Sequence, residues 1–247
     1  MKRCWKVTCA YDGTDFCGWQ SQPSKGSVQD LIQEVLGDIF EEPTVIWGSG
    51  RTDSGVHANG QVFHFYFDWR HSIKALQAAI QSKMPNSILI KKIEKVQNDF
   101  HSRKSAYGKR YIYSLYEGRA LPVDVRYCWS LNRRMNVELM QEAADRLVGK
   151  YDFSAFSATR GDGSYEDPVK DVWRLEIKKS GKKIKIITEG SGYLYKMVRS
   201  IVGALVDVGR NKLSPDQIQV ILESKKRSRH VVTAPPHGLF LDQVFYK

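Results

Sequence analysis

Several features that mark membrane proteins and metalloproteins are missing from this 247-residue sequence. No apolar run approaches the roughly 18 residues that a membrane-spanning helix needs. The N-terminal stretch is basic and then alternates between apolar and polar residues, so it has no apolar signal core. The four cysteines form no C-x-x-C pair, and no histidine completes a zinc-binding spacing. We therefore expect a cytoplasmic protein with free thiols, no metal and no membrane contact.

The signatures of cofactor-dependent enzymes are also missing. The chain has no G-x-x-x-x-G-K-[ST] loop, no G-x-G-x-x-G after a strand and no H-E-x-x-H, so we expect no cofactor. A second carboxylate is missing beside Asp53, because the next acidic residue downstream is Asp68. This spacing argues against a hydrolase with paired carboxylates and favours a lone nucleophilic or ion-paired aspartate.

Basic residues are abundant by contrast. The formal net charge is +11, from 38 Lys and Arg against 27 Asp and Glu. A protein this basic often has a polyanionic partner, and nucleic acid is the leading candidate. The alternative is charge that serves only solubility. An acidic membrane surface is disfavoured because the sequence has no long amphipathic basic helix.

Apolar periodicity predicts both strands and helices along the whole chain. Helices are predicted over residues 28–40, 72–84, 137–148, 194–208 and 215–223, and strands over 5–11, 45–47, 61–67, 88–96, 111–116, 172–177, 184–189 and 239–246. Ser27 with Asp30 forms an S-x-x-D cap, and Ser214 followed by Pro215 opens the last helix. The mixture with short connections predicts an α+β fold of two ferredoxin-like lobes.

A basic linker over residues 100–110 suggests where the lobes divide. We place an N-terminal lobe at residues 1–104 and a C-terminal lobe at residues 105–247. Sites usually lie in clefts, and we expect one between the lobes.

The segment over residues 50–58, Gly-Arg-Thr-Asp-Ser-Gly-Val-His-Ala, is the leading candidate for a functional loop. It places Asp53 among an arginine, two hydroxyls and a glycine, and a strand-like run follows it. A short polar loop against a rigid strand is a common way to present a catalytic group. The alternative is that Asp53 makes an Asx turn and pairs with Arg51 at the surface.

Six separated regions resemble the TruA family of tRNA pseudouridine synthases. They lie, in family order, at residues 10–14, 18–20, 50–58, 100–103 with 111–113, 196–203, and 234–246. The resemblance runs nearly end to end and implies an isomerase that converts uridine to pseudouridine in tRNA, at positions 38 to 40 of the anticodon stem-loop. It further implies two α+β lobes whose antiparallel sheets join across a basic cleft, and a homodimer.

The resemblance also implies roles for three residues. Asp53 matches the catalytic nucleophile, Tyr111 the tyrosine that stacks on the target base, and Arg199 the arginine that pairs with the aspartate. The N-terminal lobe would thus carry the aspartate, and the C-terminal lobe the tyrosine and the arginine. One departure is the loop over residues 159–167, which carries three acids and one arginine where we expect a more basic stretch that contacts tRNA.

The chemistry of the reaction is compatible with these residue types. The cleaved base must be held while it turns, and stacking on Tyr111 would supply roughly 1–3 kcal/mol per base; the alternative is a tyrosine of the strand core. An adjacent guanidinium favours the charged form of Asp53. We assign Arg199 to that ion pair, with a helix-surface charge as the alternative, and Arg51 to a phosphate or backbone contact.

A target uridine in a stem or a stacked loop must flip out, which costs a few kcal/mol. Phosphate contacts would offset this cost, and the candidate cations are Arg103, Lys104, Lys109, Arg110, Lys225, Lys226, Arg227 and Arg229. Each alone is more typical of a solvated charge. We expect Trp19 to pack in the core, and His57 and His64 to be structural residues and not general bases.

Two rival functions remain. One is a tRNA-binding or chaperone protein without catalysis, for which the acidic loop is the main argument. The other is a hydrolase acting on a polyanion, which would need a metal site or an acid partner that the sequence does not offer.

Overall fold

The computed structural model of this protein describes residues 2–159 and 166–247. The chain forms two structural units, and the first is built from two separate stretches of chain. Unit 1 comprises Met1–Tyr107 and Phe240–Lys247, and unit 2 comprises Gly108–Leu239. The sequence suggested a division between residues 104 and 105, with the C-terminal residues in the second lobe. In the structure, the C-terminal residues Phe240–Lys247 belong to unit 1. Most of the predicted acidic loop, residues 160–165, lies outside the described residues.

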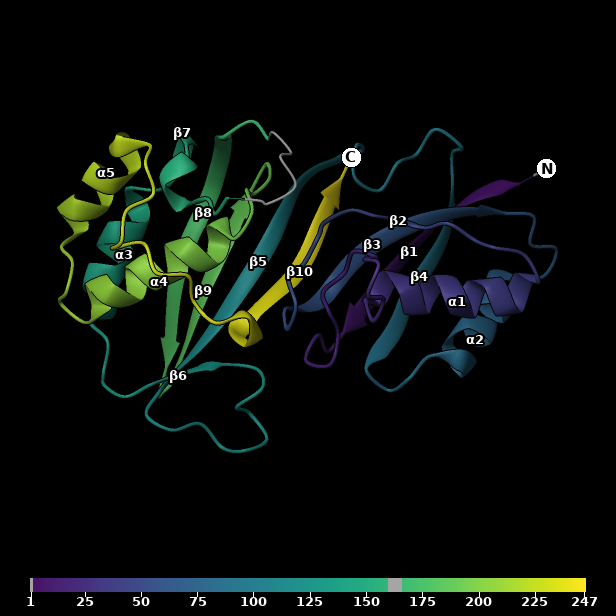
Figure 1. Cartoon of the computed structure of the whole chain (residues 1–247), viewed down its shortest axis with the longest axis horizontal. Helices are drawn as coiled ribbons and strands as arrows, with labels where there is room; N and C mark the ends of the chain where they lie inside the picture. The colour runs from purple at the N-terminus through teal and green to yellow at the C-terminus, as the bar shows by residue number, and fades with distance from the viewer. Residues whose placement is uncertain (1, 160–165) are drawn as a thin grey trace. The chain divides into compact units, whose positions relative to one another are not determined.

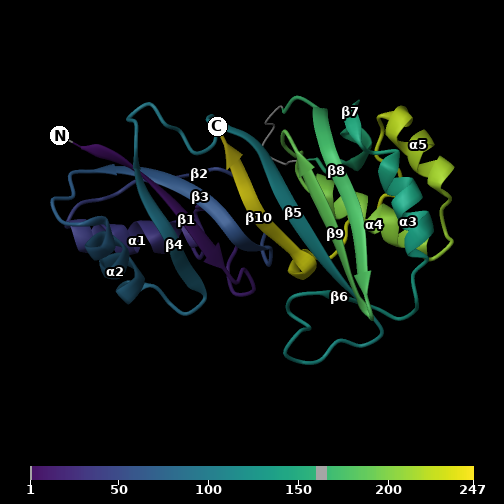
Figure 2. The ribbon, with the colours of Figure 1, turned by 180° about the vertical axis from the view of Figure 1, so that it is seen from behind.

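Unit 1 has the connectivity of a ferredoxin-like lobe. Its elements are β1 (Arg3–Tyr11), α1 (Val28–Phe40), β2 (Trp47–Gly48), β3 (His57–Phe67), α2 (Ile73–Lys83), β4 (Ile88–Val96) and, from the C-terminus, β10 (Leu239–Tyr246). The strand order is β4-β1-β3-β10, with β2 paired to β3. Strand β1 is antiparallel to β3 and β4, whereas β10 is parallel to β3. Both helices lie on one face of this sheet (Figures 1 and 2).

The first helix begins where the sequence predicted. The hydroxyl of Ser27 accepts from the amide of Asp30 at 3.1 Å, and the Asp30 carboxylate accepts from the Ser27 amide at 3.1 Å. This reciprocal capping box satisfies two amides that the helix leaves unpaired. The buried face of α1 carries Ile32 and Leu36 toward the sheet, and the helix ends where Glu41 adopts a left-handed conformation.

Unit 2 repeats a β-α-β-β-α order in its main elements. They are β5 (Ala106–Glu117), β6 (Trp129–Leu131), α3 (Val137–Asp145), β7 (Gly149–Asp152), β8 (Val169–Ser180), β9 (Lys183–Gly190), α4 (Met197–Gly209) and α5 (Pro215–Ser224), with short 3-10 turns at Ser154–Phe156 and Pro236–Gly238. The order β5-β9-β8-β7 is antiparallel throughout, and β6 runs parallel to β5. Helix α4 lies over one face of this sheet (Figures 1 and 2).

Helix α4 begins three residues later than its periodicity indicated, at Met197 and not at Leu194. Lys196 at its N-cap has φ 58°, a left-handed conformation that prevents the helix from extending further toward the N-terminus. The short strands β6 and β7 were not predicted. The last helix follows the prediction, since Ser214 and Gln217 form a capping box.

The α+β class with largely antiparallel pairing is confirmed. A join between the sheets and a basic cleft stay predictions. Among the described residues, no helix is long and apolar enough to cross a membrane.

Candidate active site

The loop that carries Asp53 is held in place by side chains from the sheet of unit 1. On β3, Gln61 donates from Nε2 to the carbonyl of Gly50 at 2.7 Å, and its Oε1 accepts from the Gly50 amide at 3.3 Å. On β1, the hydroxyl of Tyr11 shares a buried hydrogen bond of 2.8 Å with Thr52 Oγ1. The residues before the aspartate are therefore anchored to two strands.

Two glycines let neighbouring backbone press against this loop. Gly18 has φ 89°, and a Cβ there would lie 2.6 Å from the carbonyl oxygen of Thr52. A Cβ on Gly13 would lie 2.0 Å from the carbonyl oxygen of Val56. Directly after Gly18, the amide of Trp19 donates to the Thr52 carbonyl at 3.0 Å. The Trp19 ring is 1% exposed, so its predicted place in the core is confirmed.

Asp53 lies at the start of a tight turn. Its carbonyl accepts from the amide of Val56 at 3.1 Å, and Gly55 within the turn has φ 75°. The aspartate is partly exposed and Arg51 is exposed. The turn is closed by a backbone hydrogen bond, and the aspartate within it keeps partial exposure.

His57 connects this region to other strands. It is 1% exposed; its Nδ1 accepts from the amide of Gly13 at 3.0 Å and lies 3.1 Å from an Asp12 carboxylate oxygen. Its ring stacks on Phe240 with the centroids 4.7 Å apart. These contacts support the prediction that His57 is structural.

His64 is equally buried and fixes the loop that leads out of β4. Its Nδ1 accepts from the amide of Ser102 at 3.2 Å, and the Ser102 hydroxyl donates to the carbonyl of Trp47 at 2.5 Å. Burial, with a smaller effect from the neighbouring His101, lowers the pKa of His64 to about 4. The imidazole is therefore neutral near pH 7 and serves as an acceptor, which again supports a structural role.

Two residues predicted to contact phosphates, Arg103 and Lys104, lie in this anchored loop. Arg103 and Lys104 are both exposed, and their amides donate to Nδ1 of His101 at 3.2 and 3.4 Å. The hydroxyl of Tyr246 donates to the carbonyl of Ser102 at 2.6 Å and holds the loop from β10. The two cations thus project from a loop with a defined backbone.

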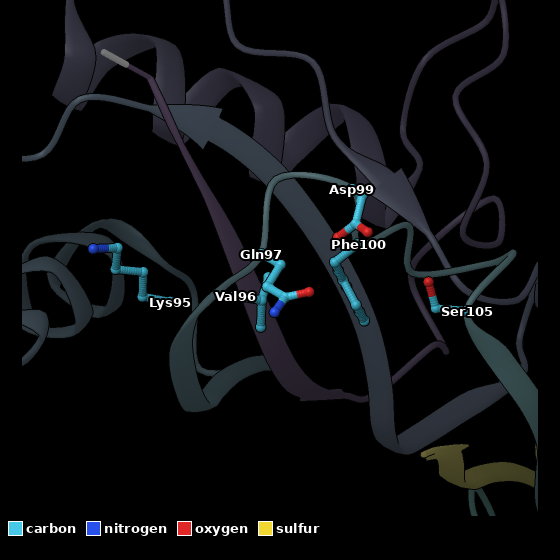
Figure 3. A pocket seen from close by; sticks show the side chains of 6 residues that line it. All are labelled: Lys95, Val96, Gln97, Asp99, Phe100 and Ser105. Atoms are coloured by element: carbon cyan, nitrogen blue, oxygen red, sulfur yellow. The ribbon is translucent and has the colours of Figure 1, made fainter.

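An open pocket of about 640 Å³ lies at the end of β4 and along the same loop. Figure 3 shows its six lining residues, which are Lys95, Val96, Gln97, Asp99, Phe100 and Ser105. None of the residues around Asp53 lines it. The candidate carboxylate is therefore presented on a turn and not inside this pocket.

In unit 2, Tyr111 is 8% exposed and lies on the helix-covered face of β5. Its ring meets that of Tyr193 edge-on, with the centroids 5.3 Å apart. The hydroxyl of Tyr193 shares a hydrogen bond of 2.9 Å with Thr188 Oγ1, and burial raises the pKa of Tyr193. The Tyr111 ring is therefore oriented by Tyr193, which is itself held by its bond to Thr188.

Strand geometry separates two residues that are adjacent in the sequence. Side chains alternate between the faces of a sheet, so Arg110 points away from the face that carries Tyr111. Its Nε donates to a carboxylate oxygen of Glu189 on β9 at 2.8 Å, and Arg174 donates to the same oxygen at 3.1 Å. A contact between Arg110 and an RNA phosphate remains a prediction, and it would compete with this ion pair. Lys109, two residues before Tyr111, lies on the same face of the strand as Tyr111.

Arg199 extends from the first turn of α4. Its Nε donates to the carbonyl of Ala234 at 2.8 Å. Apolar neighbours on the helix, Val198 and Ile201, are buried, whereas Arg199 keeps partial exposure. The guanidinium is thus held at a defined position and is not a fully solvated helix charge.

The predicted site residues fall into two groups. Unit 1 holds Asp53, Arg51, Arg103 and Lys104; unit 2 holds Lys109, Arg110, Tyr111 and Arg199. Sequence reasoning missed Gln61 as the loop anchor. The sequence did contain a signal for it. Alternation along β3 places the Gln61 side chain on the same face as Phe63 and Phe65, and a polar amide on such a buried face needs hydrogen-bond partners; Gln61 is 0% exposed.

Comparison with known proteins identifies the family. A sequence model described as tRNA pseudouridine synthase matches residues 8–103 and 143–247, a span that includes Asp53 and Arg199. The chain belongs to the tRNA pseudouridine synthase family. Tyr111 lies between the two matched stretches.

Full-length relatives agree with this family. The chain is 42% identical over 248 residues to tRNA pseudouridine synthase A 1 of Protochlamydia amoebophila, covering 99% of this chain and 96% of the relative. It is 38% identical to tRNA pseudouridine synthase A 2 of Clostridium perfringens, covering 98% of both chains. It is 40% identical to tRNA pseudouridine synthase A of Lactococcus lactis subsp. cremoris, covering 98% of this chain and 97% of the relative. As a tRNA pseudouridine synthase, the protein is an isomerase.

Proposed function

We propose that this chain converts uridine to pseudouridine at positions 38 to 40 of the tRNA anticodon stem-loop, with Asp53 as the catalytic nucleophile. The observation that carries the proposal is the anchoring of the Asp53 loop. Gln61 and Tyr11 hold the residues on its N-terminal side, while the aspartate itself keeps partial exposure. A carboxylate that must act on a bound base needs this combination of rigid backbone and access.

The reaction balances without a co-reactant. The N1–C1′ bond of the nucleotide breaks, the base turns, and a C5–C1′ bond forms while the proton on C5 is transferred to N1. Asp53 could begin by attacking C6, by attacking C1′ or by taking a proton from the sugar; all three use the same carboxylate.

The supporting residues follow from this proposal. Tyr111 stacks on the flipped base, which leaves the base able to rotate in its plane. The guanidinium of Arg199 favours the ionised form of the aspartate. The exposed Arg51, Arg103 and Lys104 contact phosphates and supply a salt-sensitive affinity. The active species is a homodimer in the cytoplasm.

Substitution of the aspartate tests the proposal. Asp53→Asn keeps the shape of the side chain, so tRNA binding should persist while pseudouridine formation falls by at least about 10³-fold. Asp15→Asn, which removes the same charge from an exposed position, is the matched control. Single-turnover conversion and nucleotide-resolution mapping give the rate and the target positions. Conversion by Asp53→Asn at the wild-type rate would contradict the role of the carboxylate.

The rival is a tRNA-binding protein without catalysis, which is relevant because of the acidic loop near residue 160. It predicts that wild-type protein binds tRNA and forms no pseudouridine even with enzyme in excess over tRNA. The same single-turnover measurement therefore separates the two functions.

A further inference from the structure

The segment from Val231 to Pro235, which we call the strap, lies against helix α4 in unit 2. The Ala234 amide donates to the carbonyl of Arg199 at 3.0 Å, and Arg199 Nε donates back to the Ala234 carbonyl at 2.8 Å. A guanidinium is a rigid planar fork, so a bond at Nε restricts the directions in which its two terminal nitrogens can point. The position of the strap therefore constrains the orientation of the Arg199 guanidinium.

The strap approaches α4 unusually closely. A Cβ on Gly203 would lie 1.9 Å from the carbonyl oxygen of Val232, so only glycine fits there without movement of the backbone. At the other end, the buried hydroxyl of Tyr113 donates to the carbonyl of Pro235 at 2.8 Å. Both ends of the strap are thus held, and a small shift of it would be transmitted to Ala234.

Arg227 connects the strap to the helix. Its Nη2 donates to the carbonyl of Val231 at 2.8 Å and to Thr233 Oγ1 at 2.9 Å, both in the strap. Its Nη1 donates to Ser200 Oγ on α4 at 2.9 Å and to the carbonyl of Ser157 at 3.2 Å. These four bonds engage every N–H group of the two terminal nitrogens.

This arrangement distinguishes Arg227 from its basic neighbours. Arg227 is exposed, as are Lys225, Lys226 and Arg229 of the same charge run, whose phosphate contacts stay a prediction. What marks Arg227 is that its terminal nitrogens bond within the protein. An arginine whose terminal N–H groups all serve the fold has only Nε–H left for a phosphate. A lysine could not replace it fully, because its one nitrogen carries three N–H donors and cannot make all four bonds.

We infer that Arg227 is a positioning residue for Arg199, acting through the strap and through Ser200, which adjoins Arg199 on α4. The inference rests on the catalytic role proposed above for Arg199. Arg227→Lys keeps the charge and removes the fork, so it separates positioning from electrostatic attraction to RNA.

The first test needs no tRNA and no activity. In protein labelled with ¹⁵N-arginine, the Nε–H signal of Arg199 is assigned with Arg199→Lys and compared between wild type and Arg227→Lys. We expect the signal to shift and its hydrogen exchange to become faster. Arg146→Lys, at another arginine of unit 2 that lies in ion pairs, is the matched control and should leave the signal unchanged. An unchanged signal in Arg227→Lys would overturn the inference.

The second test separates catalysis from binding. Single-turnover conversion at saturating tRNA should fall about 10- to 100-fold in Arg227→Lys, since a misplacement of about 1 Å costs on the order of 10²-fold. The dissociation constant for tRNA should stay that of wild type, and Arg227→Lys should cause no further loss in an Arg199→Ala background. A larger dissociation constant for tRNA, with an unchanged rate at saturating tRNA, would mean that Arg227 contacts a phosphate. That result would refute its role in positioning Arg199.

A third variant covers loss of folding. If thermal unfolding shows that Arg227→Lys is not folded, Thr233→Val removes only one bond on the strap side and takes its place in both tests. If wild-type protein forms no pseudouridine, the proposed function fails, while the NMR comparison still decides whether Arg227 orients Arg199.

Discussion

The side-chain amide of Gln61 bonds to both the amide and the carbonyl of Gly50, three residues before Asp53. Gln61 is fully buried, and its two bonds to Gly50 are part-buried. The loop and β3 are therefore coupled through one side chain.

Gln61→Leu should weaken catalysis as well as stability. The part-buried amide and carbonyl of Gly50 would lose their partners, at about 0.5–1.5 kcal/mol each in the free energy of unfolding. The control is Gln81→Leu, since Gln81 also bonds one amide and one carbonyl, on β4. Urea unfolding should show destabilisation of both variants, while single-turnover conversion should fall in Gln61→Leu alone. An equal loss of rate in both would mean that the anchor acts only through stability.

Stability should fall below neutral pH because of His64. Its pKa is about 4 in the folded protein and about 6.5 when unfolded, so the unfolded chain binds more protons between these values. The contribution is fully present above pH 6.5 and is lost as the pH falls toward 4. Between pH 7 and pH 5 we expect a decrease of about 2 kcal/mol in the free energy of unfolding.

His64→Gln should remove most of this pH dependence and lower stability at pH 7, since the amide cannot reproduce the packing of the ring. His71→Gln, at an exposed histidine, should leave the pH dependence as in wild type. Denaturant unfolding across this pH range is the measurement. A slope in His64→Gln that equals that of wild type would assign the effect to other groups.

Arg103 and Lys104 should contribute to tRNA affinity through charge. Each phosphate contact releases counterions, so replacing both residues with alanine should reduce the slope of log affinity against log salt by about 2. The control replaces Arg70 and Lys74, which are also exposed cations of unit 1. Binding isotherms at several salt concentrations measure the slope. If both pairs change the slope equally, the loop has no special contact with tRNA.

Much of the fold follows from local signals. Ser27 with Asp30 and Ser214 with Gln217 mark helix starts, because each side chain of the pair accepts from the other residue's backbone amide. This interaction spans only three residues, so it is local. The late start of α4 could not be predicted in the same way. The left-handed conformation of Lys196 has no signal in its residue type, since lysine seldom adopts it.

The same contrast applies to the site. Sequence by itself determined the family, the class of reaction and Asp53 as the candidate carboxylate, because these depend on residue types at short spacings that survive without a structure. Only the tertiary structure decided that Gln61 and Tyr11 hold the loop and that Arg110 lies on the other face of β5 from Tyr111. It also decided that Arg227, although exposed, bonds to the strap and to α4. Hydrogen bonds between residues distant in the chain carry these facts, and their geometry exists only after the sheets and helices have packed.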